Sequence, residues 1–183
     1  MTDPAAAIAD TRRWIEAVVI GLNLCPFARR PFDNNQIRFV VSDATRPAGL
    51  EADLRRELEA LAAAPAGEVE TTLLIHPHVL TDFFDYNDFL DTADGLIEEL
   101  DLEGVIQIAS FHPNYQFAGT APDAVENSTN RSPYPMLHLL REASVERAVE
   151  SLADPDEVPR RNVETMRRLG REGVLRLLRG DAG

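Results

Sequence analysis

Short runs of β-branched and apolar residues alternate with longer segments of helical periodicity along most of this chain. The strand-like runs cover residues 37–42, 71–75 and 105–110. Amphipathic patterns before and between them predict helices over residues 5–22, 50–63 and 82–100. Strands that alternate with helices are typical of an α/β layer structure, most simply with parallel strands joined by right-handed crossovers. The sequence therefore predicts the α/β class.

The last third of the chain is predicted to be helical. Helices are expected near residues 135–152 and 160–179, and the second begins after Pro159. We therefore expect a small, mainly parallel sheet of three or more strands with flanking helices and a C-terminal helical segment. Three strands make a small sheet, so we expect a further strand or a homodimer. A chain of 183 residues is long enough for one core and short for two, which predicts a single α/β domain over 1–183.

Acidic residues dominate the charge of the protein, which is -13 at pH 7. Residues 68–103 contain eleven Asp and Glu and no Arg or Lys, whereas residues 159–180 carry seven Arg. The acidic segment would repel phosphate backbones, so we do not expect nucleic acid as a partner. The two segments could pair within a subunit, pair between subunits, or form solvated helix faces.

The chain contains no lysine, because all 18 basic residues are Arg. A pyridoxal phosphate Schiff base and a P-loop nucleotide site each need a lysine amine, so both are excluded. No window approaches the roughly 18 apolar residues of a membrane span, and the start of the chain lacks a signal-peptide pattern. We therefore expect a cytoplasmic protein without membrane contact.

The dipeptide His-Pro ends two of the predicted strands. His76 follows residues 71–75, and His112 follows residues 105–110. If these strands run parallel, both imidazoles lie at one sheet edge, where open α/β sheets bind ligands. His78 would share a face with His76 in extended chain, and the three imidazoles could hold zinc or iron. The alternative is that His76 and His78 lie on the surface and His112 is a hydrogen-bonded core residue.

Cys25 is the only cysteine and follows the first predicted helix. Pro26 suits the first position of a new helical turn, which would make Cys25 its N-cap. The N–H groups of that turn, with Arg29 and Arg30 nearby, would favour a thiolate that acts as a nucleophile or metal ligand. A place at the end of the preceding helix would have the opposite effect, and a buried inert cysteine is the other interpretation.

A long polar loop follows the third predicted strand. Its hydrogen-bonding side chains include Asn114, Tyr115, Asn130 and Ser132. Arg131 can grip a carboxylate or phosphate in fork geometry, so the implied ligand is a small anionic molecule. His138 and Arg141, three residues apart on the expected helix, would reach into the same crevice. The alternative is a surface loop held by its own amide hydrogen bonds, with His138 in the core.

Three motifs resemble those of a known family. They are Gly-Leu-Asn-Leu-Cys-Pro-Phe-Ala at 21–28, Ile-Gln-Ile-Ala-Ser-Phe-His-Pro at 106–113 and Thr-Asn-Arg-Ser-Pro-Tyr-Pro at 129–135. With residues 85–90, they make nearly the whole chain resemble an uncharacterised bacterial family known as domain of unknown function 1415. The resemblance implies that Cys25, His112 and residues 130–132 are motif positions. It assigns no reaction.

These residues together predict an enzyme that acts on a small anionic metabolite. Cys25, His112 and His138 are the expected catalytic residues, and the loop side chains and Arg141 are expected to bind the substrate. The reaction could be metal-assisted, or it could be a metal-free hydrolase or transferase reaction with a cysteine nucleophile. A non-catalytic metabolite-binding or interaction protein is the alternative from another class.

Overall fold

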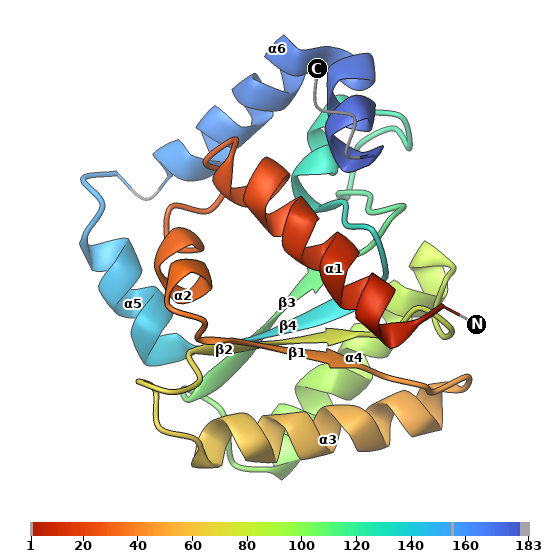
Figure 1. Ribbon diagram of the computed structural model, residues 1–183, viewed down its shortest axis with the longest axis vertical. Helices are drawn as coiled ribbons and strands as arrows, with labels where there is room; N and C mark the ends of the chain where they lie inside the picture. Colours follow the sequence, from red (N-terminus) through yellow and green to blue (C-terminus); the bar gives the residue numbers. More distant parts are fainter. Residues whose placement is uncertain (1, 155, 180–183) are drawn as a thin grey trace.

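A four-stranded mixed sheet forms the centre of the protein, with helices on both of its faces (Figure 1). The computed structural model describes residues 2–154 and 156–179. The strands are β1 (Ile37–Val41), β2 (Thr71–Ile75), β3 (Ile106–Phe111) and β4 (Met136–Arg141). The helices are α1 (Pro4–Trp14), α2 (Arg29–Asp33), α3 (Pro47–Ala63), α4 (Phe83–Glu99), α5 (Glu142–Glu150) and α6 (Glu157–Arg179), with a π-helix η1 (Ile15–Ile20) and a 3-10 helix η2 (Val125–Asn130).

The strand order is β1-β2-β4-β3. β1 pairs with β2 in parallel, whereas β4 is antiparallel to both of its neighbours, β2 and β3. The α/β class and the expected further strand are confirmed, but the prediction of a mainly parallel sheet is wrong. Because β2 and β3 both oppose β4, they run in the same direction and end at the same edge of the sheet. We call this edge the carboxyl edge; β1 ends there too.

The helix predicted near residues 135–152 is wrong for its first part, because Met136–Arg141 form strand β4. A short apolar run cannot be assigned to helix or strand by periodicity alone. Here the run fills the space between β2 and β3 and satisfies the backbone groups of both strands. His138 and Arg141 therefore lie on a strand, where a spacing of three places them on opposite faces.

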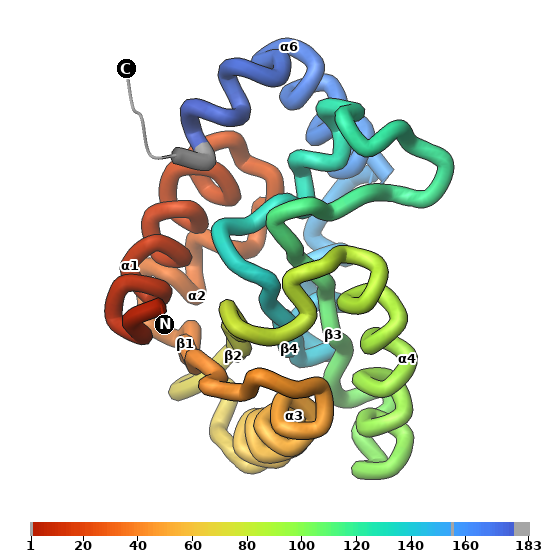
Figure 2. Tube along the Cα trace, turned by 90° about the vertical axis from the view of Figure 1, so that its right-hand side faces the viewer, coloured from red at the N-terminus to blue at the C-terminus, as the bar shows by residue number. Residues whose placement is uncertain are grey.

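The sheet separates two clusters of buried residues. One, on the α4 side, joins α3 and α4 to Leu74 and Leu137. The other, on the α1 side, joins α1 and η1 to Leu73 and Met136. Figure 2 shows α1 and α2 on one side of the strands and α4 on the other. Neighbouring residues of a strand point to opposite faces of the sheet, so alternate residues along each strand join alternate clusters.

Helix ends follow the sequence signals closely. Asp82 caps α4, because its carboxylate accepts the N–H groups of Phe84 at 2.8 Å and Asp85 at 3.3 Å. The first predicted helix is interrupted, since η1 takes π-helical geometry after Trp14. Gly170, at φ 66°, divides α6 into two parts.

Among the described residues, no helix is both long and apolar enough to cross a membrane.

Arg141 holds the end of α3. Its guanidinium donates hydrogen bonds to the carbonyl oxygens of Leu61 at 2.8 Å, Ala64 at 2.6 Å and Val69 at 3.0 Å. The last carbonyl groups of a helix have no partner within the helix, so this guanidinium supplies one. Arg141 thus joins β4 to the C-terminal end of α3.

We predict that Arg141→Met lowers the free energy of unfolding by about 2 kcal/mol, because hydrogen bonds from a charged donor to these carbonyls are lost. Urea denaturation measures this change. Arg147→Met is the matched control, because among the described residues Arg147 bonds only to Ser144, on an exposed helix face. Equal stability of the two variants would contradict the assigned role.

Candidate functional site

His76 and His112 meet at the carboxyl edge. Each follows a strand that ends there, and both imidazoles lie against the ring of Tyr86 on the α4 side. The ring centroid of Tyr86 is 5.8 Å from that of His76 and 5.1 Å from that of His112. The prediction that the two proline-flanked imidazoles share one edge is confirmed.

Both imidazoles bind the loop that joins β2 to α4. His76 donates from Nδ1 to the carbonyl oxygen of Val79 at 3.0 Å, and His112 donates from Nε2 to that of Leu80 at 3.2 Å. The Nδ1 atom of His112 accepts the backbone N–H of Asn114 at 3.0 Å. Leu80 has a φ of 54°, a left-handed conformation that costs a non-glycine residue energy. The two imidazoles therefore hold a strained loop by consecutive carbonyl groups.

One ring nitrogen of His76, Nε2, takes no part in the hydrogen bond to Val79. Its side chain is fully buried, and Nε2 has no hydrogen-bond partner among the described residues. Burial lowers the pKa of His76 to about 4, so the ring is neutral near pH 7 and Nε2 carries a lone pair. Burial also lowers the pKa of His112, but both of its ring nitrogens are already bonded. Of the two, only His76 has a nitrogen ready for another group.

The hydroxyl of Tyr86 is inserted between β3 and β4. It donates to the carbonyl oxygen of Met136 at 2.9 Å and accepts the N–H of Phe111 at 3.1 Å. Phe111 and Met136 lie opposite each other in the register, so the phenol bridges the last pair of the two strands. Burial raises the pKa of Tyr86, which keeps the hydroxyl protonated. Sequence analysis missed this residue, although its spacing of three from Phe89 on α4 was a signal.

Arg131 lies in the loop that follows β3. Its guanidinium donates to the carbonyl oxygens of Pro122 at 2.7 Å and Tyr115 at 3.3 Å. The described residues place no carboxylate within 4.0 Å of it, and burial, followed by repulsion from Arg171, lowers its pKa. The ring of Tyr115 packs 5.2 Å from that of Phe83, centroid to centroid. The loop therefore carries a partly buried cation that is bonded to the backbone of Tyr115, and the ring of Tyr115 packs against Phe83.

The other polar residues of this loop bind the chain itself. Asn130 donates to the carbonyl oxygen of Ser110 and Ser132 donates to that of Tyr134, while Asn114 contributes its backbone N–H. Asn127, which sequence analysis missed, is fully buried and accepts hydrogen bonds from Phe117 and Thr120. These contacts match the alternative of a loop held by its own hydrogen bonds.

His138 and Arg141 do not reach the imidazole pair. His138 lies on the α1 side, where it donates to the hydroxyl of Thr71 at 2.7 Å, because that hydroxyl itself donates to the carbonyl oxygen of Leu139. Burial lowers the pKa of His138 to about 4. Arg141 lies at the opposite edge of the sheet, at the end of α3. The sequence-based placement of both residues in one crevice was wrong because it assumed a helix.

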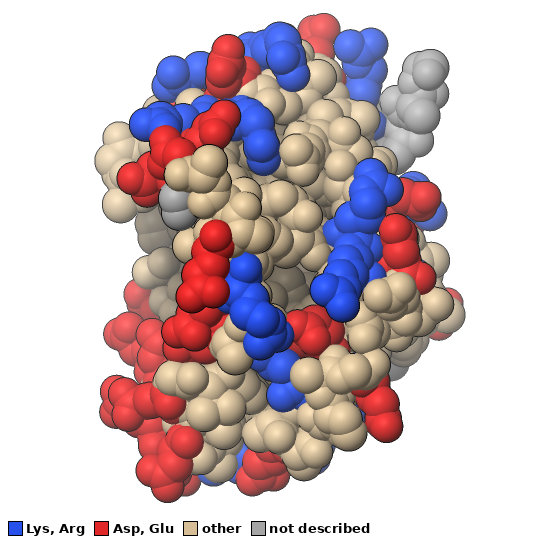
Figure 3. Space-filling model, turned by 90° about the vertical axis from the view of Figure 1, so that its left-hand side faces the viewer, with Lys and Arg blue, Asp and Glu red and all other residues tan. Residues whose placement is uncertain are grey.

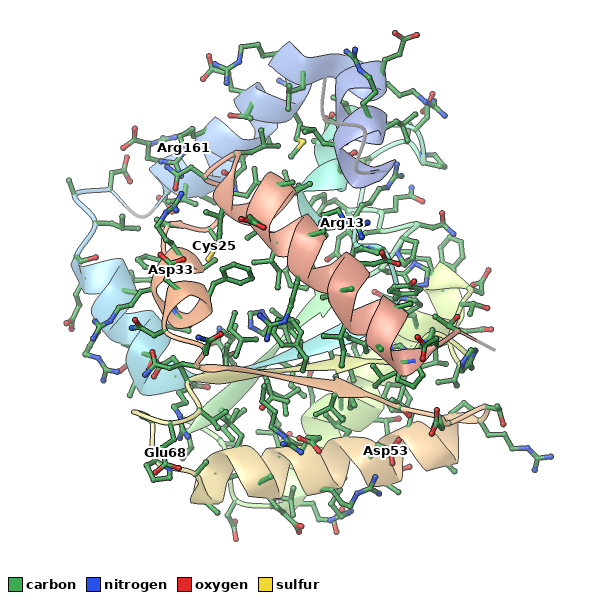
Figure 4. The ribbon with its side chains drawn as sticks, viewed as in Figure 1. Arg13, Cys25, Asp33, Asp53, Glu68 and Arg161 are labelled. Atoms are coloured by element: carbon green, nitrogen blue, oxygen red, sulfur yellow. The ribbon has the colours of Figure 1, made fainter. Side chains whose placement is uncertain are left out.

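Cys25 is also on the α1 side, beside α2 and the start of α6 (Figure 4). It is not the N-cap of α2, which begins at Arg29 after Ala28. It begins a turn in which the N–H of Ala28 bonds to its carbonyl oxygen at 3.3 Å. Although the residue is exposed, loss of water around the sulfur raises the pKa of the thiol. The backbone N–H groups of Phe27 and Ala28 act in the opposite direction, but their effect is smaller. The thiol is thus protonated and separated from His76 by the sheet.

The three imidazoles proposed as metal ligands do not assemble. His78 is partly exposed, and both nitrogens of His112 are taken by backbone groups. Within residues 2–154 and 156–179, no three His, Cys, Asp or Glu side chains are placed to hold a metal ion. Of the ring nitrogens of His76 and His112, the Nε2 atom of His76 is therefore the one that remains available to a metal ion.

A second feature of the carboxyl edge was missed by sequence analysis. A shallow hollow of about 330 Å³ lies where β1 ends and α3 begins. It is lined by Val41, Asp43, Ala44, Gly49, Asp53 and Arg56. Asp53 accepts the hydroxyl of Ser42 and pairs with Arg56, so its carboxylate is already satisfied. The hollow offers less unsatisfied polar chemistry than His76 does.

Residues 6–176 match the family described as protein of unknown function DUF1415. The chain belongs to the DUF1415 family. No curated protein and no solved structure matches the chain significantly. In this DUF1415 protein the motifs at 106–113 and 129–135 meet, because the N–H of His112 donates to the carbonyl oxygen of Asn130 at 3.3 Å. The motif at 21–28 lies on the α1 side of the sheet, where Leu24 shares an apolar cluster with Phe111 and Tyr134.

We predict that Tyr86→Phe lowers the free energy of unfolding by about 2 kcal/mol, because it leaves a buried N–H and a buried carbonyl without partners. Thermal and urea denaturation measure the loss. Tyr115→Phe is the control, since in the described part of the chain the Tyr115 hydroxyl takes part only in a long 3.5 Å hydrogen bond, which it accepts from Ser110. If both variants lose the same amount, the bridging role of Tyr86 is wrong.

Stability should fall as the pH is lowered from about 6.5 to about 4. The pKa values of His76 and His138 are near 4 in the folded protein and 6.5 as model values, so the unfolded chain binds more protons in this window. Each residue contributes on the order of 3 kcal/mol that is fully present above the window. In His138→Gln, unfolding free energy should depend less steeply on pH than in the unmodified protein. An unchanged slope would contradict the neutral state of His138.

Proposed function

We propose that this DUF1415 protein is an enzyme that acts on a small anionic molecule at the carboxyl edge. His76 would be the general base, and Arg131 would bind the anionic group. The observation that carries this proposal is the Nε2 atom of His76, which is fully buried and lacks a partner among the described residues. Natively buried polar atoms are nearly always hydrogen-bonded, so this atom needs an explanation, and a ligand at the carboxyl edge would supply the missing partner.

The geometry around His76 suits proton transfer. The hydrogen bond from Nδ1 to Val79 fixes the tautomer, so Nε2 faces away from the loop as an acceptor. Nε2 would take a proton from water or a ligand hydroxyl as that oxygen attacks, and would return it to the leaving group. The carbonyl of Val79 would stabilise the imidazolium formed in between. His112 and Tyr86 act as positioning residues, because their hydrogen bonds hold the loop and the strand ends.

Arg131 supports the anionic character of the ligand. Its guanidinium bonds to two neutral carbonyl groups, and within the described part of the chain its charge is not balanced by a nearby carboxylate. A carboxylate or phosphate would add the missing charge. The strained Leu80 makes the loop 76–82 the element whose opening would admit the ligand to the buried imidazole.

A thiol reaction at Cys25 and a metal-assisted reaction both stay predictions. The first would need the thiol, which lies on the α1 side of the sheet, to reach His76, and the second would need further metal ligands beside His76. A non-catalytic binding protein is the second candidate. It is favoured by the loop around Asn130 and Ser132, whose polar groups are engaged in holding its own backbone. Such a loop could bind an anion through Arg131 without turnover.

Binding is tested with inorganic phosphate, pyrophosphate and oxalate. At a concentration about 100-fold above Kd, a ligand that binds only the folded state adds about 2.7 kcal/mol of stability and raises the melting temperature. We expect such a shift for the unmodified protein and for Arg168→Gln, an exposed arginine of α6, and no shift for Arg131→Gln. Equal shifts in both variants, or none in any protein, would contradict anion binding by Arg131.

Catalysis is tested with p-nitrophenyl phosphate and p-nitrophenyl acetate as general hydrolysis probes. The variant His76→Asn keeps an amide donor at the position of Nδ1 and removes Nε2. We expect it to remain folded and to lose at least 100-fold of any turnover, in keeping with the usual size of general base catalysis. Retained turnover would exclude His76 as the base. Anion binding without turnover of either probe would favour the binding protein.

A further inference from the structure

The outward face of α4 is a row of carboxylates. Its exposed acidic residues are Asp85, Asp88, Asp91, Asp94, Glu98 and Glu99. Only Glu99 has an ion-pair partner among the described residues, Arg55 at 2.8 Å. Like charges three or four residues apart on a helix repel each other. The carboxylates of this face therefore repel each other, and a cationic partner would reduce that repulsion.

An apolar side chain stands beside this row. Phe84, in the first turn of α4, is 68% exposed, more than any other large apolar residue described. Its neighbour Phe83 turns inward and packs against Tyr86 and His112. Phe84 and Asp88 lie one helical turn apart, so an apolar and an anionic group are adjacent on one face.

The second half of α6 presents the complementary pattern. Leu175 is 36% exposed, and Arg171 lies four residues before it on the same face. The only carboxylate near Arg171 in the described residues is that of Asp123, at 4.0 Å. Arg176 in this half, and Arg168 just before the kink at Gly170, are exposed and form no ion pair within the described residues. An apolar group and a cation thus stand one turn apart, in the reverse order to Phe84 and Asp88.

The two faces cannot meet within one molecule. Figures 1 and 2 show α6 at the top of the molecule and α4 near the bottom. The space-filling view has arginines along the top and carboxylates along the lower left edge (Figure 3). The ion pairs of α6 are made with Asp154, Glu126 and Asp123, all outside α4.

We propose that a second copy of this chain docks the second half of its α6 on the acidic face of α4, in antiparallel orientation. Leu175 of one copy would cover Phe84 of the other, and Arg171 would pair with Asp88. Exposed ion pairs contribute up to about 1 kcal/mol each, and the net charge of -13 opposes association. The complex is therefore weak, and it is formed at intermediate salt, where overall repulsion is screened.

Two charge-reversed proteins test this contact by analytical ultracentrifugation. One carries Asp85→Arg, Asp88→Arg and Asp91→Arg, and the other carries Arg168→Glu, Arg171→Glu and Arg176→Glu. We expect each alone to lose at least tenfold of the association constant of the unmodified protein. An equimolar mixture should regain it, because the reversed faces are again complementary.

The control reverses three acidic residues outside α4, with Glu59→Arg, Glu146→Arg and Glu150→Arg. It changes the net charge by the same amount as the variant with three arginines on α4, so it should not weaken association. Phe84→Ala should weaken association, and salt of about 1 M, where the Debye length is about 3 Å, should do the same. A monomer at every concentration, or a mixture of reversed proteins that does not associate, would overturn the proposal.

Discussion

The antiparallel placement of β4 between β2 and β3 determines where the candidate site of this protein lies. Since both neighbours oppose β4, they end at one edge and bring His76 and His112 together there. The same strand supplies Met136, whose carbonyl binds the hydroxyl of Tyr86. One pairing choice thus fixes the strand ends, the phenol between them and both imidazoles. It also places His138 on the opposite face of the sheet.

Burial then decides the state of these polar groups. Taking an imidazole out of water disfavours its charged form, so the buried rings are neutral and their hydrogen bonds are directional. His112 uses both nitrogens on backbone groups, whereas His76 uses one. The two residues share a dipeptide sequence and an edge, yet differ in what they can still bind. This difference, more than the number of imidazoles, is the reason we propose His76 as the reactive group of this DUF1415 protein.

Sequence reasoning succeeded where local periodicity decides structure. It located β2, α3 and α4 closely, because their apolar patterns and the cap at Asp82 agree. It failed at residues 136–141, where pairing with two strands overrides a pattern that also fits a helix. That error displaced His138 and Arg141, since a helix and a strand project residues three apart differently. The roles of Tyr86 and Leu80 depend on distant backbone groups, which no local pattern reveals.

The tautomers of the two imidazoles test the central claim most directly. Long-range proton–nitrogen correlation spectra at neutral pH report which ring nitrogen of each histidine carries the proton. The account predicts opposite neutral tautomers, with the proton on Nδ1 of His76 and on Nε2 of His112. The same tautomer in both residues, or a charged His76 at neutral pH, would contradict it.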